Sequence, residues 1–214
     1  AILPLLTKTH TPRATESAVK YFLTQAAASA MLLAASTMNA LHTGQWDITQ
    51  LTTQPAITML TLALMMKLGL APLHAWLPEV MQGTSTKMAL LIATWQKLAP
   101  FALLFMLSHL VHIPTILSFA LLSTLIGGWG GLNQTQLRKL MAFSSIAHLG
   151  WVTSMVTLNK HLALAILGLY ISMTTTMFST MMPTNMKSLK DTATIWPTLP
   201  PMMLTTLLTL ISLG

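Results

Sequence analysis

Long apolar stretches alternate with short polar connections along the whole chain. A helix needs about 20 mostly apolar residues to cross a bilayer, and six stretches reach this length. The predicted full spans are 16–41, 56–80, 88–108, 114–132, 138–157 and 162–182, with partial spans at 1–6 and 198–214. We therefore predict an all-α fold, a polytopic bundle of transmembrane helices that forms a single membrane domain over residues 1–214.

Composition excludes a soluble domain. Charged residues make up 7% of the chain, whereas an ordinary globular protein has roughly 25%. The net charge is +7, but the lysines and arginines are scattered between apolar stretches and form no basic face for a nucleic acid. The chain has no cysteine, so disulfides, thiolate metal sites and cysteine nucleophiles are excluded.

Both ends of the sequence lie within apolar stretches, AILPLLTKTH and LISLG. The sequence has neither an initiator methionine nor a signal peptide. We therefore expect an internal fragment of a longer protein, and the first and last spans are predicted as partial for this reason.

The basic residues of the connections are unevenly distributed. If the spans alternate in direction, only Lys160 falls on one side of the membrane. On the other side fall Lys8, Arg13, Lys20, Lys87, Arg138, Lys139, Lys187 and Lys190. Such a bias is typical of the cytoplasmic side of a membrane, or of the matrix side in a mitochondrion.

Two lysines lie inside predicted spans. Lys67 is about eleven residues into the span 56–80, or roughly 16 Å along a helix, and Lys97 lies at a similar depth in 88–108. The centre of a hydrocarbon core about 30 Å thick is costly for a charge and too deep for snorkelling. Both lysines are therefore expected to face protein or water, where they can accept and release protons. Taken singly, either is also compatible with an ion pair that serves assembly alone.

Further polar groups follow Lys67 in the same span. His74 comes two helical turns later and is expected on the same helix face. Pro72 lies between them and has no backbone N–H, so we predict a broken helix around Pro72 whose unwound backbone faces a hydrated cavity. Glu79 is expected near the membrane surface, where the span ends. Structural roles stay open for His74 and Glu79.

His148 lies about ten residues into the span 138–157, one turn after Ser144. Three predicted spans thus carry a basic or titratable group at similar depth. Proton movement along protonatable groups joined by water fits this pattern, although a buried histidine bonded to Ser144 is also a common structural feature. We find no sequence motif of a redox centre, a phosphate-binding loop or a metal site.

The segment GGWGG near the end of the span 114–132 places two glycines four residues apart, Gly127 and Gly131. Small residues at this spacing let two membrane helices approach closely. We interpret the segment as a helix-packing feature.

Several segments together carry a resemblance to a known family. TPRATESAVKYFLTQ, MKLGLAPLHAWLPEV, TWQKLAP, GGWGGLNQTQLRKLMAFSSIAHLGW and the final SLG resemble the antiporter-like membrane subunits of mitochondrial NADH:ubiquinone oxidoreductase, respiratory complex I. The resemblance runs the whole length of the chain. It implies long membrane helices, one of them broken, and a role in proton translocation coupled to electron transfer from NADH to ubiquinone.

The resemblance also implies which residues carry the function. In the family, a lysine in the broken helix and a lysine in the next helix belong to a central hydrophilic axis, and they match Lys67 and Lys97. Glu79 in LPEV, His148 in SSIAH and His74 in PLHAW match as well. These five residues are therefore the candidate proton path.

Partners and location follow from the same resemblance. The implied partners are the other membrane subunits of complex I, the lipid bilayer, protons and internal water. NAD, FMN, iron–sulfur clusters and ubiquinone are implied to bind to other subunits, so we expect this chain to hold neither a cofactor nor a metal. The implied location is the mitochondrial inner membrane, with the Lys/Arg-rich connections on the matrix side.

Two other interpretations stay open. One is a free-standing cation/proton antiporter subunit, which flanking sequence with ion-selective acids would indicate. The other is a purely structural membrane subunit, in which Lys67 and Lys97 serve only assembly and tolerate substitution.

Overall fold

The computed structural model describes residues 2–7, 10–184, 186–195 and 200–213. Some of the predictions above rest on residues outside these ranges, namely Ala1, Lys8, residues 198–199 and Gly214. The described residues form α-helices joined by short connections. The helices are α1 Leu3–Leu6, α2 Pro12–Thr43, α3 Gln54–Leu68, α4 Trp76–Gly83, α5 Thr86–Ala93, α6 Trp95–Leu107, α7 Ile113–Leu132, α8 Leu137–Leu158, α9 Lys160–Thr184, α10 Leu189–Ile195 and α11 Pro200–Leu213.

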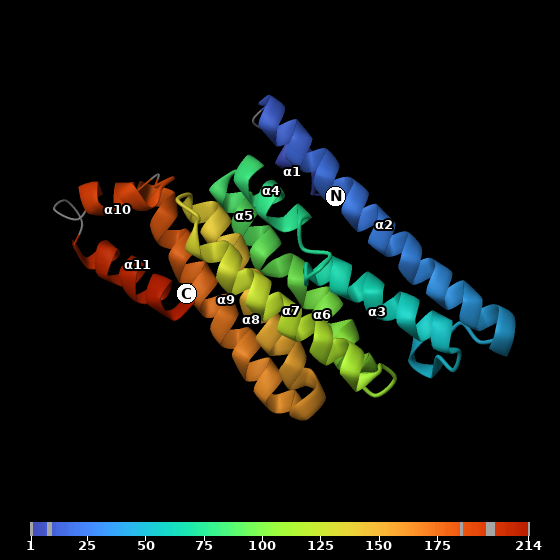
Figure 1. Cartoon of the computed structure of the whole chain (residues 1–214). Helices are drawn as coiled ribbons and strands as arrows, with labels where there is room; N and C mark the ends of the chain where they lie inside the picture. Colours follow the sequence, from blue (N-terminus) through green and yellow to red (C-terminus); the bar gives the residue numbers. More distant parts are fainter. Residues whose placement is uncertain (1, 8–9, 185, 196–199, 214) are drawn as a thin grey trace.

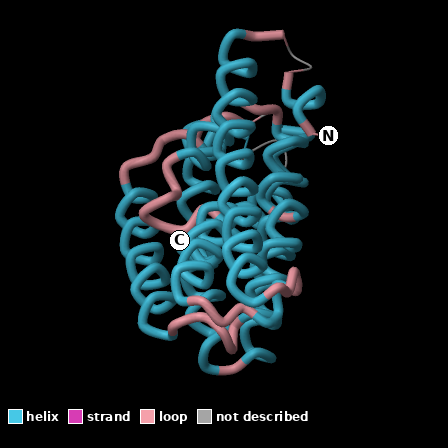
Figure 2. Tube along the Cα trace, turned by 90° about the vertical axis from the view of Figure 1, so that its right-hand side faces the viewer, coloured by secondary structure: helices cyan, strands magenta, loops and turns pink. Residues whose placement is uncertain are grey.

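The helices form a bundle in which α2 lies along one side, against α3 and α4 (Figure 1). On the other side α7 packs along α8, α8 packs on α9, and α11 covers part of α9. The short helices α5 and α6 contact each other, and they pack on α9 and α3 respectively. The connections gather towards the two ends of the bundle (Figure 2). This arrangement confirms the predicted all-α helix bundle.

Large apolar side chains cover much of the outer surface. Leu125, Trp129 and Leu132 on α7 are 66%, 78% and 83% exposed, as expected for a surface that faces lipid or neighbouring membrane subunits. By length and composition, five helices of the described part can cross a membrane: Pro12–Thr43, Thr86–Leu107, Ile113–Leu132, Leu137–Leu158 and Lys160–Thr184.

The predicted span 56–80 is interrupted, and the break around Pro72 is confirmed. Helix α3 ends at Leu68, and Gly69 adopts the left-handed conformation, with φ 78°. Glycine accepts this conformation without steric cost and commonly ends helices. The chain resumes a helix only at Trp76. Because of the interruption, α3 by itself is too short to count among the five long helices.

Two side chains satisfy backbone groups that the break leaves without helical partners. The Ser123 hydroxyl of α7 accepts a hydrogen bond from the Ala71 N–H at 2.9 Å and donates to the Phe119 carbonyl at 2.6 Å. The Trp76 indole donates to the Met66 carbonyl at 3.2 Å. Buried backbone groups need such partners, so α7 holds the broken segment in place.

Replacing Ser123 with alanine is expected to lower the thermal stability of the assembled complex. The buried Ala71 N–H would lose its acceptor, which costs about 1–3 kcal/mol. The measurement is the midpoint of thermal inactivation, with the substitution in the full-length subunit. Ser118→Ala is the matched control, because Ser118 is exposed on the same helix and bonds only within its own helix, to Thr115. Equal midpoints for the two variants would contradict the anchoring role of Ser123.

The predicted span 88–108 corresponds to the apolar stretch Thr86–Leu107, but it contains a break that was not predicted. Helices α5 and α6 meet at Thr94, whose backbone φ and ψ are −111° and −70°. The Lys97 N–H bonds to the Thr94 carbonyl at 3.2 Å, where a regular α-helix would use the carbonyl of Ala93. The remaining differences are smaller: α9 includes Pro183 and ends at Thr184, and the short helix α10 was not predicted.

Several predicted basic connections lie at one end of the bundle. The Arg138 guanidinium bonds to the Thr84 carbonyl, which joins the start of α8 to the α4–α5 connection. The Leu137 N–H bonds to the Lys187 carbonyl at 3.2 Å, which adds the α9–α10 connection. A second group of connections includes α2–α3 and α6–α7, which are joined by a hydrogen bond of 3.1 Å between Gln54 and His112. The side of a membrane that each end faces stays a prediction.

Candidate functional site

Lys97 is the most deeply buried charged side chain of the described residues, at 2% exposed. It lies in the first turn of α6, just after the break at Thr94. Its ammonium donates to the Ser145 hydroxyl of α8 at 3.2 Å and lies 5.8 Å from the centre of the Tyr170 ring of α9. Both ion pairs of the described chain involve Lys20, so no carboxylate compensates Lys97 within this part of the protein.

Tyr170 joins Lys97 to His148. It is 1% exposed, and its ring centre lies 5.8 Å from that of the His148 ring. The His148 Nδ1 lies 2.9 Å from the Ser144 carbonyl. A carbonyl only accepts, so Nδ1 carries a hydrogen there and a neutral His148 keeps Nε2 as a proton acceptor. The structure therefore brings two of the predicted residues, Lys97 and His148, into one buried cluster.

Sequence reasoning missed Tyr170 and Ser145. A tyrosine within an apolar span is typical of core packing, and the serines of SSIAH are ordinary helix residues. Their role is visible only because three helices meet: α6 supplies the lysine, α8 the serine and histidine, and α9 the tyrosine.

Lys67 lies in the last turn of α3, directly before the break. It is half-buried and forms neither a hydrogen bond nor an ion pair with the described residues. Helix α3 packs against α6, so the helices that carry Lys67 and Lys97 are neighbours. An unpaired lysine beside unwound backbone is accessible to water or to a partner chain.

His74 does not share a helix face with Lys67, and this prediction was wrong. The helix ends at Leu68, so the two-turn spacing no longer applies, and His74 lies in the non-helical segment before Trp76. Its Nδ1 is buried without a hydrogen-bond partner among the described residues.

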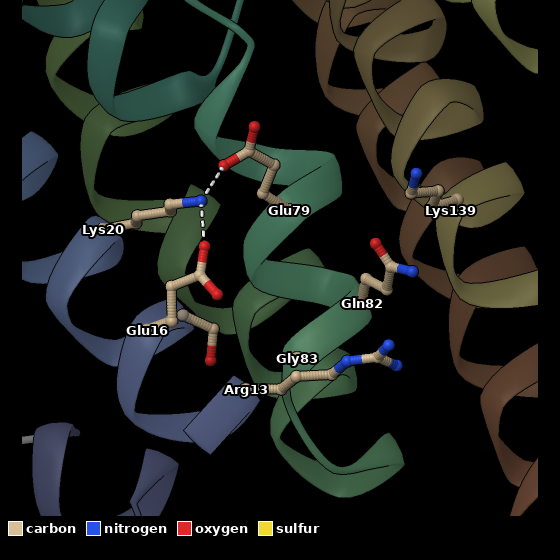
Figure 3. A pocket seen from close by; sticks show the side chains of 8 residues that line it. Arg13, Glu16, Lys20, Glu79, Gln82, Gly83 and Lys139 are labelled. Carbon is tan, nitrogen blue, oxygen red and sulfur yellow. Dashed lines mark hydrogen bonds and ion pairs between the residues drawn. The ribbon is translucent and has the colours of Figure 1, made fainter. Parts of the chain in front are cut away.

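Glu79 lies in a separate, charged pocket at the basic end of the bundle (Figure 3). The pocket has a volume of about 330 Å³ and lies between α2, α4 and α8. The Lys20 ammonium lies 2.7 Å from a Glu79 oxygen and 2.5 Å from a Glu16 oxygen. The Glu79 side chain is 53% exposed, so this ion pair contributes little to stability. The ion pair with Lys20 joins Glu79 to α2 and not to the cluster around Lys97.

The buried cluster can hold and pass protons. A serine hydroxyl both accepts and donates, and Ser145 does so between Lys97 and the Ala142 carbonyl, to which it donates at 2.7 Å. His148 offers a further proton acceptor beyond the Tyr170 ring. An aromatic ring does not conduct protons, so the step between Lys97 and His148 requires water. No group of three or more metal-ligating side chains occurs in the described ranges.

A polytopic bundle of apolar helices with a broken helix and an unpaired lysine at the break is the architecture of an antiporter-like membrane protein. The chain belongs to the NADH:quinone oxidoreductase/Mrp antiporter transmembrane family, whose model matches residues 1–214. This finding confirms the family resemblance.

Curated relatives match over the full chain. The NADH-ubiquinone oxidoreductase chain 2 of Xenopus laevis is 51% identical over 214 residues, and that of Sus scrofa is 48% identical over the same length. The chain spans 62% of the length of each of these relatives. It therefore corresponds to a part of their sequence.

Solved structures share the fold. A chain of respiratory complex I from Thermus thermophilus has a TM-score of 0.88 and 28% identity, covering 99% of this chain and 51% of that one. A chain of the Mrp complex from Dietzia has a TM-score of 0.70 at 17% identity, covering 80% and 35%. The second likeness shows the fold alone.

Proposed function

We propose that the chain is part of a core membrane subunit of NADH:ubiquinone oxidoreductase, complex I, and contributes to proton translocation coupled to electron transfer from NADH to ubiquinone. Relatives at about half identity over the whole chain carry the name NADH-ubiquinone oxidoreductase chain 2. The observation that carries the proton role is the burial of Lys97 at 2% exposure, without a carboxylate partner in the described part.

The cost of burying this lysine favours a functional role over a structural one. An ionisable group inside a membrane protein is expensive and is usually functional. A lysine retained for assembly would be compensated by an acid, and Lys97 instead meets a serine hydroxyl and an aromatic ring. The free-standing antiporter has less support, because the Mrp likeness extends to the fold alone.

In this proposal Lys67 and Lys97 each hold and release a proton, and His148 receives one beyond Lys97. Glu79 lies in the pocket at the basic end of the bundle, and in this proposal His74, in the segment before α4, connects the broken helix with that surface. The basic end faces the matrix, and the membrane is the mitochondrial inner membrane.

The rest of the enzyme supplies the redox chemistry. NADH, FMN, the iron–sulfur clusters and ubiquinone bind to other parts of the complex, and this chain holds no cofactor. Its partners are the neighbouring membrane subunits, lipid, protons and internal water. The large exposed apolar side chains of α7 are available for such neighbours.

The test is replacement of Lys67 by methionine in the full-length subunit within the intact complex. We expect normal assembly, because methionine is apolar and of similar size. NADH:quinone turnover and proton pumping in sealed vesicles are both expected to fall severalfold. Lys87→Met is the matched control, since Lys87 is exposed in the first turn of α5. Normal turnover and pumping in the Lys67 variant would remove it from the proton path.

A further inference from the structure

The buried tyrosine of α9 contacts both titratable groups of the cluster. The Tyr170 ring centre lies 5.8 Å from the Lys97 ammonium and 5.8 Å from the centre of the His148 ring. Tyr170 is also among the largest fully buried side chains of the described chain. Its ring is therefore held between α6 and α8 by packing on all sides.

The Tyr170 hydroxyl is anchored at the helix break that precedes Lys97. It donates to the Ala93 carbonyl at 2.9 Å. In a continuous helix this carbonyl would accept from the Lys97 N–H, but that N–H bonds to Thr94. The tyrosine hydroxyl thus replaces the missing helical donor. The break leaves the Ala93 carbonyl without its helical donor. By accepting from the Tyr170 hydroxyl, this carbonyl holds the tyrosine beside Lys97.

The ring and the serine together define where the ammonium lies. An aromatic face attracts a cation, and the attraction is stronger where water is excluded. The Ser145 hydroxyl accepts from the Lys97 ammonium at 3.2 Å. Lys97 therefore contacts both Ser145 of α8 and the Tyr170 ring of α9.

We propose that Tyr170 is a positioning residue for proton transfer between Lys97 and His148. Its hydroxyl bond to Ala93 holds the ring against both side chains, so that their separation is fixed and a water chain can join them. The ring itself carries no proton: a proton that leaves the Lys97 ammonium passes through water to Nε2 of His148. This inference rests on the proton-translocating function proposed above.

The test uses substitutions in the full-length subunit within the assembled complex. Tyr170→Phe keeps the ring and the volume but removes the anchor, and turnover is expected to fall about three- to fivefold with normal assembly. Tyr170→Leu also removes the aromatic face, and turnover is expected to fall at least about tenfold. The matched control is Tyr21→Phe, which removes a tyrosine hydrogen bond of similar length, 2.8 Å to Gln96, and should leave turnover unchanged.

A double substitution separates positioning from packing. If Tyr170 acts through Lys97, Tyr170→Leu combined with Lys97→Met is expected to be no slower than Lys97→Met alone. Losses that multiply in the double variant would overturn the proposal. Unchanged turnover in Tyr170→Phe would overturn it as well, and this variant remains decisive if Tyr170→Leu fails to assemble.

The same experiments distinguish the two proposals. Unchanged turnover and pumping in Lys97→Met would refute a proton role for Lys97, and the positioning role of Tyr170 would fall with it. A loss in Lys97→Met together with a fully active Tyr170→Phe would refute the positioning role alone.

Discussion

Replacing Lys97 with methionine is expected to give an assembled complex whose NADH:quinone turnover and proton pumping fall at least about tenfold. Lys97 is 2% exposed and has no carboxylate partner in the described part of the chain. Methionine fills a similar volume, leaves no buried charge unpaired, and needs no desolvation of an ammonium group. Stability is therefore expected to be preserved while a protonatable group is lost.

The control for this experiment is Lys160→Met. Lys160 also lies over an aromatic ring, with its ammonium 5.5 Å from the centre of the Phe105 ring, but it is exposed at the α8–α9 connection. Its substitution should leave turnover and pumping unchanged. If the Lys97 variant assembled poorly and the surviving complex worked at the normal rate, Lys97 would be an assembly residue.

Replacing Gly127 with leucine is expected to cause the largest loss of assembled complex. A Cβ at this position would lie 2.6 Å from the Ala147 backbone nitrogen and 2.9 Å from its Cα. Backbone cannot move aside as a flexible side chain does, so α7 and α8 would have to separate. Forced overpacking of this kind costs about 3 kcal/mol, and close helix contact through glycine is what membrane interfaces use.

The adjacent glycine provides a matched control. A Cβ at Gly128 would meet nothing within 4 Å, and Gly128→Leu changes helix propensity in the same way. The measurement is the amount of complex on native gels and its thermal inactivation midpoint. Because Ala147 lies next to His148 on α8, the remaining Gly127 variant complex should also turn over more slowly. Equal amounts of complex for both variants would show that α7 and α8 tolerate separation.

The sequence by itself determined the helix bundle and the broken helix, and it singled out the two lysines inside apolar stretches. Bilayer thickness sets the length of an apolar stretch, which locates most spans. Proline has no N–H and glycine favours left-handed backbone, so the break between Leu68 and Trp76 follows from local chemistry. The close helix contact at Gly127 was also predicted from local chemistry, because glycine has no side chain to keep a neighbouring helix away.

Only the tertiary structure decided what surrounds Lys97. Ser145 and Tyr170 lie on other helices, and their contacts with Lys97 depend on how α6, α8 and α9 cross. Hydrophobic periodicity records which residues are buried but not which residues of different helices meet. The break at Thr94 is of the same kind, because its freed carbonyl is satisfied by a tyrosine far along the chain. For His74 the sequence prediction failed. Helical spacing predicted that His74 and Lys67 share a helix face, but the helix ends between them.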